Sequence, residues 1–313
     1  MTYRVRHRTE YQYASDVSSS YGEMHLSPRD LPEQRCHSTV IKIDPVPDDY
    51  RDRLDFFGNR VGTFAIHHRH RHLIVTATSV VDVVGRQETL PLLADQPWEV
   101  VAAGLRGAPS AETLDARQYV LESPSVAVSD QLIEYAGRSF VPGRGLLEAV
   151  TDLMGRVHRD FEFKPGATSV TTTLDELFSG RAGVCQDFAH LAIACLRTVG
   201  LPARYVSGYL ETEPPAGRPR LVGADVSHAW ASMFVPAIGW VDLDPTNNQF
   251  VNDRYVTVGW GRDYTDVPPL KGVIFTEGET HELKVTVDVV PIDPEPERLD
   301  GWGPVALPDA CPG

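Results

Sequence analysis

The chain has 313 residues, 42% of them hydrophobic, and a formal net charge of -14. This length and apolar content suffice for two modest domains, while the negative charge repels phosphate backbones and anionic lipid. We therefore expect neither nucleic acid nor a membrane as a partner. No run approaches the roughly 20 apolar residues of a membrane span, and the start, MTYRVRHRTEYQY, lacks the apolar core of a signal peptide, which predicts a cytoplasmic protein.

The first 85 residues have the pattern of short strands. Period-two alternation recurs in YRVRHRTEYQY, HSTVIKIDPV and HLIVTATSVVDVV, separated by turn-rich segments. This predicts an N-terminal antiparallel β-sandwich domain over residues 1–85. Its histidine run, IHHRHRHL, suits an exposed strand face better than a metal site, because imidazoles along one strand are spaced too widely for tetrahedral ligation.

Residues 86–112 show no sustained period and are predicted to be a connector. A second domain follows at 113–292, with helical signals in its first half. Ser129 can cap one helix, an apolar stripe from Leu146 to Val157 marks a second, and Thr173 with Glu176 forms a capping box for a third. Strands follow, and the proline-rich tail, 293–313, is expected to be a docked coil or disordered.

Two of the four cysteines lie on one predicted helix in GVCQDFAHLAIACLRTVGLPARYVSGYL, and their surroundings differ. Cys195 belongs to the apolar stripe, where its thiol would keep its proton. Cys185 stands at the first turn, where unpaired backbone N–H groups and the helix dipole favour a thiolate. Cys185 is therefore the candidate nucleophile. The four cysteines are too few and too dispersed for a disulfide framework, and no CxxC pair indicates zinc.

A base and an orienting acid lie downstream, in DVSHAWASMFVPAIGWVDLDPTN. If these two strands form a hairpin in which Phe234 faces Trp240, His228 lies diagonal to Asp244 on one sheet face. A register shifted by one residue would place them on opposite faces. Asp242 has the same parity as Asp244 and is an alternative partner of the histidine.

These motifs resemble those of the transglutaminase-like superfamily, in the bacterial branch that carries an N-terminal β domain. The resemblance rests on the cysteine-bearing segment, SHAW, GWVDLDPTN and GRDYTDVPPLKG, and covers most of the chain. It implies an α+β fold with a papain-like, transglutaminase-like core of helices packed on an antiparallel sheet. It also implies Cys185 as nucleophile, His228 as base and Asp244 as the carboxylate that orients it. No cofactor or metal is implied, and the chain has no DxDxDG calcium loop.

The resemblance implies a cysteine-dependent amide or peptide hydrolase that forms a thioester acyl-enzyme with a peptide or protein substrate. The alternatives are an acyltransferase that uses an amine co-substrate and a non-catalytic binding module. The backbone N–H of Cys185 is the first expected oxyanion donor, whereas a second is not evident; Gln186 is a weak candidate. Asp187 and His190 are expected to be structural or cleft-lining, and the loop from Asp263 to Asp266 is a possible cleft border.

Overall fold

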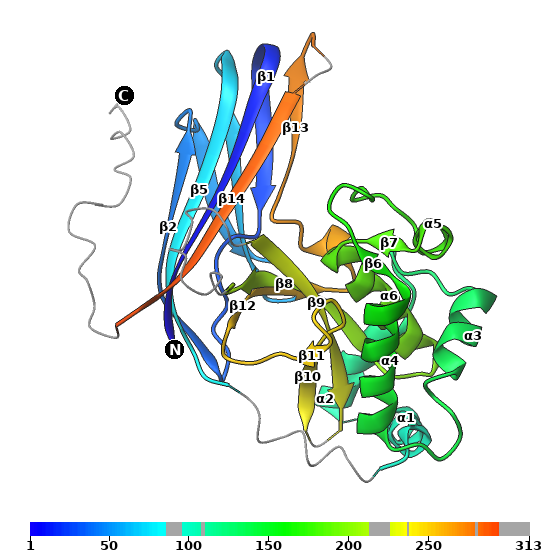
Figure 1. The fold of residues 1–313 in the computed structure, drawn as a ribbon. Helices are drawn as coiled ribbons and strands as arrows, with labels where there is room; N and C mark the ends of the chain where they lie inside the picture. Colours follow the sequence, from blue (N-terminus) through cyan, green and yellow to red (C-terminus); the bar gives the residue numbers. More distant parts are fainter. Residues whose placement is uncertain (86–95, 108–109, 213–225, 237, 279–280, 294–313) are drawn as a thin grey trace, which may run out of the picture.

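The computed structural model describes residues 1–85, 96–107, 110–212, 226–236, 238–278 and 281–293 (Figure 1). It contains an antiparallel sheet of seven strands, a second antiparallel sheet of five, and a group of helices. The five-stranded sheet lies between the seven-stranded sheet and the helices (Figure 1).

The seven-stranded sheet is organised around one long strand, β1 (Thr2–Met24). Its first half pairs with two strands, and its second half pairs with two others. This change of partners curls the sheet. The neighbours of the first half are β5 (His70–Val83) and β14 (His281–Ile292), those of the second half are β4 (Arg60–Ile66) and β13 (Leu270–Thr276), and β2 (Gln34–Asp44) and β3 (Asp49–Leu54) complete the sheet.

The five-stranded sheet carries the histidine and the aspartates singled out in the sequence. Its order is β11-β10-β9-β8-β12. Gly239 pairs with Val235 and Trp240 with Phe234, which confirms the expected hairpin register. The strands are β8 (Ala203–Leu210), β9 (Val226–Val235), β10 (Gly239–Asp244), β11 (Gln249–Phe250) and β12 (Tyr255–Gly261).

The cysteine-bearing helix, α6 (Cys185–Thr198), is the central helix of the core. It packs on β8 and β9 and is also contacted by α3, α4 and α5. A helix surrounded in this way buries apolar side chains on several faces rather than along one stripe. The other helices are α1 (Trp98–Arg106), α2 (Ala111–Arg117), η2 (Gln118–Val120), α3 (Asp130–Gly137), α4 (Leu146–Asp160), α5 (Leu174–Gly180) and η3 (Tyr264–Asp266); β6 (Glu162–Phe163) and β7 (Ala182–Gly183) form a short parallel pair.

The two sheets are joined by an apolar cluster and by a polar seam. Tyr3, Val5 and Val289 of the seven-stranded sheet pack against Tyr209 and Val256 of the five-stranded one. Burying such side chains away from water favours a fixed contact between the two halves.

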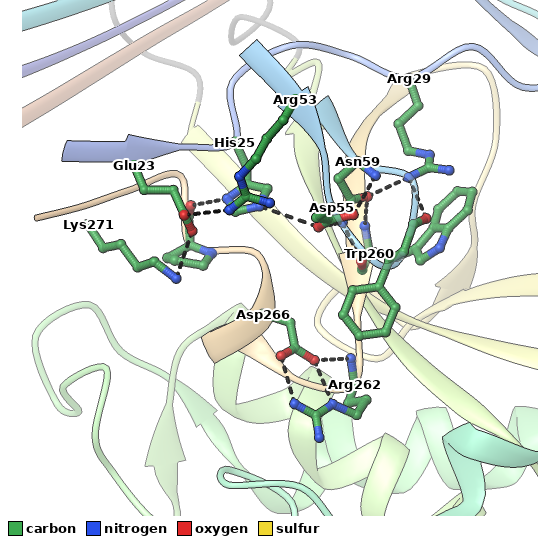
Figure 2. Close-up of polar contacts among 12 residues, drawn as sticks. Glu23, His25, Arg29, Arg53, Asp55, Asn59, Trp260, Arg262, Asp266 and Lys271 are labelled. Atoms are coloured by element: carbon green, nitrogen blue, oxygen red, sulfur yellow. Dashed lines mark hydrogen bonds and ion pairs between the residues drawn. The ribbon is translucent and has the colours of Figure 1, made fainter. Parts of the chain in front are cut away.

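The polar seam lies along the outer edge of β12. Asn59 donates to the Trp260 carbonyl at 2.8 Å and accepts from its N–H at 3.0 Å, and Gln34 makes the same paired contact with Thr257 at 2.7 Å each. Figure 2 shows Asn59 between Arg29, Asp55 and Trp260. Two side-chain amides thus satisfy backbone groups that a further strand would otherwise have to pair.

The predicted α+β fold class is confirmed, with an N-terminal antiparallel sheet and helices packed on a second antiparallel sheet. Ser129 caps α3, the apolar stripe forms α4, and the Thr173–Glu176 box caps α5, as expected.

The structure differs from the expected domain organisation in two places. Residues 270–292, expected in the second domain, form β13 and β14 and pair with β1 in the first sheet. Strand alternation alone does not reveal which sheet a strand joins. The predicted connector, 86–112, contains α1, a short helix that buries Val101, Ala102 and Leu105; the tail from 294 onward lies outside the described residues.

Among the helices that the structure describes, none combines the length and the apolar character needed to cross a membrane.

Candidate active site

Cys185 is the first residue of α6, as the sequence predicts. The preceding strand β7 ends at Gly183, and the backbone N–H of Val184 donates to the carboxylate of Asp187 at 2.8 Å. Asp187 also accepts from the Thr168 hydroxyl at 2.6 Å, so this carboxylate caps the helix, in agreement with the structural role expected for it. The thiol of Cys185 is half-buried at a helix N-terminus, where the dipole favours negative charge.

His228 and Asp244 form a buried pair. The imidazole Nε2 of His228 lies 2.7 Å from Oδ2 of Asp244, and both side chains are almost completely inaccessible to solvent. The register in which Phe234 faces Trp240 places His228 and Asp244 on one face of the sheet, which is the arrangement that a catalytic role for the pair requires.

Asp244 is fully buried, with 0% of its surface exposed, yet it is well satisfied by donors. Oδ1 accepts from the N–H groups of Thr246 at 2.9 Å and Asn247 at 3.2 Å. Oδ2 accepts from Asn247 Nδ2 and from the Tyr255 hydroxyl, each at 2.6 Å. Burial alone would raise the pKa of this carboxyl, but the hydrogen bond and charge of His228 and the side-chain hydrogen bonds from Tyr255 and Asn247 outweigh it and lower the pKa.

The imidazole of His228 also interacts with Cys185. Burial favours the neutral ring, whereas hydrogen bonds to Asp244 and to Cys185 favour the charged ring and raise the pKa of His228 to about 10. Since Nε2 is engaged by Asp244, Nδ1 is the nitrogen left to face the thiol. The structure therefore brings together the three residues singled out in the sequence.

The other candidates have different surroundings. Asp242, the alternative partner of His228, makes no side-chain hydrogen bond to it among the described contacts, and its Oδ1 is buried without a donor. Gln186 donates its amide to the Val170 carbonyl at 3.3 Å, so it is engaged away from an oxyanion. Cys195 is fully buried, which raises the pKa of its thiol to about 12 and agrees with the predicted structural role.

His190 is a structural residue in this arrangement. Its Nε2 accepts from the backbone N–H of Tyr264 at 3.1 Å, and burial lowers the pKa of the ring to about 4 despite the nearby Asp263. Asp263 is itself buried and caps η3, while Asp266 pairs with Arg262 at 2.9 Å. The GRDYTDV segment is therefore attached to α6 through the contact between Tyr264 and His190.

No group of three or more His, Cys, Asp or Glu side chains within the described ranges could hold a metal ion. The histidine run lies partly in the turn after β4, where His67 and His68 are exposed, but His70 is buried and stacks edge-on to Tyr13, contrary to the expected exposed face. All three described cysteines, at 36, 185 and 195, are free thiols.

Three residues that support the pair of His228 and Asp244 lie outside the candidates predicted from the sequence. Asn247 and Tyr255 donate to Asp244, and Gln249 donates its Nε2 to the Tyr255 hydroxyl at 2.6 Å. Asn247 lies in the turn after Asp244, and asparagine side chains commonly form hydrogen bonds within turns, so this residue has a local signal. Tyr255 carries no such local signal, since it reaches Asp244 from β12, across the sheet from β10.

Two models of known protein families match parts of the chain. A model of the bacterial transglutaminase-like N-terminal region matches residues 3–82, and a model of the transglutaminase-like superfamily matches residues 136–245. The second range contains Cys185, His228 and Asp244.

Relatives cover nearly the whole chain. An uncharacterised protein of Mycobacterium tuberculosis is 47% identical over 93% of each chain, and one of Mycobacterium leprae is 33% identical over 91% of this chain and 97% of its own. The crystal structure of a protein from Cytophaga hutchinsonii, proposed to be a cysteine protease, superposes with a TM-score of 0.71 at 19% identity, over 94% of this chain and 92% of the other. The chain belongs to the transglutaminase-like superfamily, in the group that carries the bacterial transglutaminase-like N-terminal region.

Proposed function

We propose that the protein is a cysteine-dependent amide or peptide hydrolase in which Cys185 is the nucleophile, His228 the general base and acid, and Asp244 the residue that orients the imidazole. The observation that carries this proposal is the buried contact between His228 and Asp244 at 2.7 Å, with Cys185 near enough to the imidazole to raise its pKa. A nucleophile, a base that contacts it and a third residue that orients the base form the arrangement that several unrelated folds use for acyl transfer.

The reaction runs in two halves. His228 takes the thiol proton of Cys185, and the thiolate attacks the amide carbonyl to form a tetrahedral intermediate whose oxyanion faces the N–H of Cys185. The imidazolium then gives its proton to the departing amine, which leaves a thioester. In the second half His228 takes a proton from water and the hydroxide attacks the thioester. The imidazolium then returns this proton to the departing sulfur, so the acid is released and the thiol is restored.

Asp244 makes this cycle possible without changing its own protonation. As an ionised acceptor it holds Nε2–H, so Nδ1 is unprotonated in the neutral ring and free to accept the thiol proton. It also stabilises the imidazolium formed in each half, which agrees with the raised pKa of His228.

The test is site-specific acylation of the thiol. The native protein is incubated with a library of peptide p-nitrophenyl esters, and the acylated residue is located by mass spectrometry, with Cys185→Ser and Cys195→Ser as variants. We expect acylation at residue 185, its loss in Cys185→Ser, and its retention in Cys195→Ser, because the thiol of Cys195 is fully buried. Modification at Cys195 instead would refute the proposal, and unreactive protein would favour a non-catalytic binding module.

An amine in place of water would make the same enzyme an acyltransferase. This second candidate is favoured by one comparison: 28% of the chain is 40% identical to a protein-glutamine gamma-glutamyltransferase of Pseudomonas aeruginosa, over 14% of that protein. The two outcomes are separated by adding a primary amine such as cadaverine to the acyl-enzyme and measuring the ratio of amide adduct to free acid. An adduct that forms faster than the acid is released would establish the acyltransferase.

We further propose that the enzyme works in the cytoplasm on a peptide or protein, with neither nucleic acid nor membrane as partner. Free thiols in the described residues suit a reducing compartment, and the net charge of -14 disfavours anionic partners. Cell fractionation of the tagged protein tests the location.

A further inference from the structure

We propose that Tyr255, itself oriented by Gln249, is a positioning residue that fixes the carboxylate of Asp244 and thereby the imidazole of His228. The inference rests on the proposed function and assigns a role to a strand that carries none of the three reacting or orienting residues. It is carried by the geometry of the hydrogen bonds around Asp244.

The hydrogen-bond chain has a fixed direction. Gln249 Nε2 is a donor, so the Tyr255 oxygen accepts from it at 2.6 Å. The single hydroxyl proton of Tyr255 is then directed to Asp244 Oδ2, also at 2.6 Å. Proton donation therefore runs from Gln249 through Tyr255 to Asp244, where it meets the donation from His228 on the same oxygen.

Tyr255 differs from the other donors in where it comes from. The Thr246 and Asn247 groups belong to the turn that follows Asp244 and move with it. Among the described donors to Asp244, only His228 and Tyr255 come from other elements. Tyr255 is the first residue of β12. It thus links the carboxylate at the end of β10 to β12, a strand of the same sheet that is separated from β10 by β9 and β8. A catalytic base is held in place more precisely when the residue that orients it is itself fixed by hydrogen bonds and packing.

The ring of Tyr255 is independently held by packing. It lies edge-on to Trp230, with centroids 5.4 Å apart, and 6.0 Å from the ring of His228. The side chain is 2% exposed. A Tyr255→Phe change therefore removes the hydroxyl while the ring keeps its contacts, which makes the variant a clean test of the hydrogen bond.

The titratable groups that meet at this place are few. Asp244 on β10 faces His228 from β9 and Tyr255 from β12, and Cys185 from α6 faces His228. The hydroxyl of Tyr255 favours the ionised carboxylate, so its removal raises the pKa of Asp244. As the solution is acidified, Asp244 of the variant is therefore protonated at a higher pH than Asp244 of the native protein, and the triad loses its orienting charge there.

The experiment measures the rate of Cys185 alkylation by iodoacetamide from pH 3 to 9 in full-length protein, with the site read by mass spectrometry. In Tyr255→Phe we expect the acid limb of the profile to move up by about one pH unit, the size of one hydrogen bond to a charged group. Gln249→Leu should move it in the same direction by less, because the phenol remains. The matched control is Tyr135→Phe, which removes the hydroxyl of another buried tyrosine that donates to a carboxylate, Asp160, at 3.0 Å and away from the site.

The outcomes separate this inference from the function on which it rests. If the acid limb of the pH profile is the same in Tyr255→Phe, Tyr135→Phe and the native protein, Tyr255 has no positioning role. The triad still stands in that case, provided that His228→Ala abolishes rapid alkylation. Native Cys185 that alkylates at the rate of an ordinary thiol, unaffected by His228→Ala, overturns the triad itself. Equal shifts of the acid limb in Tyr255→Phe and Tyr135→Phe would mean a general loss of packing and would also overturn the inference. Urea unfolding of each variant tests whether it is folded.

Discussion

At the scale of single residues, the site depends on which of two aspartates on one strand holds the imidazole. Both Asp242 and Asp244 have the parity to face His228, but only Asp244 bonds to it in the described structure. Asp244→Asn replaces the charged acceptor by an amide that is surrounded by donors. We expect the alkylation rate of Cys185 at pH 7 to fall at least about tenfold, because the imidazolium loses its counter-charge.

Asp242→Asn is the matched control, since it makes the same chemical change two residues away on β10. Its alkylation rate should equal that of the native protein. If Asp242→Asn slowed the reaction as much as Asp244→Asn, the assignment of the orienting carboxylate would be lost.

The raised pKa of His228 has a consequence for stability as well as for reactivity. Its folded pKa is about 10, above the value of an unfolded histidine, so the group binds its proton more tightly in the native state. This stabilisation is complete below the unfolded pKa of about 6.5 and is lost as the pH rises through the folded value. We expect the free energy of unfolding in urea to fall from pH 6 to pH 10 more steeply in the native protein than in His228→Gln. Parallel slopes would show that the imidazole is not charged in the folded state.

At the scale of elements, the tip of α6 depends on Asp187. This carboxylate caps the helix through the Val184 N–H and holds the loop before α5 through Thr168. Asp187→Ala should lower the free energy of unfolding by about 1–2 kcal/mol, the usual cost of losing a cap, and should slow alkylation of Cys185 by displacing the helix tip. Urea unfolding and the alkylation rate are the measurements.

The control for this prediction is Asp175→Ala in the first turn of α5. That acidic residue is exposed, and the cap of α5 is formed instead by Thr173 and Glu176. Its loss should change the unfolding free energy by at most about 0.5 kcal/mol. Equal effects of the two substitutions would contradict the capping role of Asp187.

The elements also show how far the sequence could lead. Helices α3, α4 and α5 have caps or apolar stripes in their own sequence, and the alternation of β9 and β10 limits their pairing to two kinds of register. Local chemistry of this kind is readable without a structure. The support of Asp244 by Tyr255 is not, because it depends on strands paired across a sheet rather than along the chain. The same limit hid the place of β14, whose alternation would fit either sheet.

At the scale of the whole molecule, the seam along β12 couples the two sheets. Asn59 is buried and bonds to both backbone groups of Trp260, to Asp55 and to Arg29. Asn59→Ala leaves these backbone groups at the sheet edge without partners, so we expect a loss of about 2–4 kcal/mol in the free energy of unfolding. Urea unfolding followed by tryptophan fluorescence measures it.

Gln12→Ala is the control, because it also removes an amide side chain but from an exposed position on β1. It should change stability by no more than about 0.5 kcal/mol. Should Asn59→Ala prove equally mild, the paired amide contacts would contribute little to holding the two sheets together.

The pairing of β1 with β14 places Thr2 opposite Ile292, so the first strand that the structure describes lies beside the last one that it describes. During translation β1 can pair with β5 early, but its other edge has to wait for β14, which lies far beyond β5 in the sequence. Until then the nascent chain presents an open strand edge beside tyrosine and valine side chains, which is a natural binding place for a chaperone.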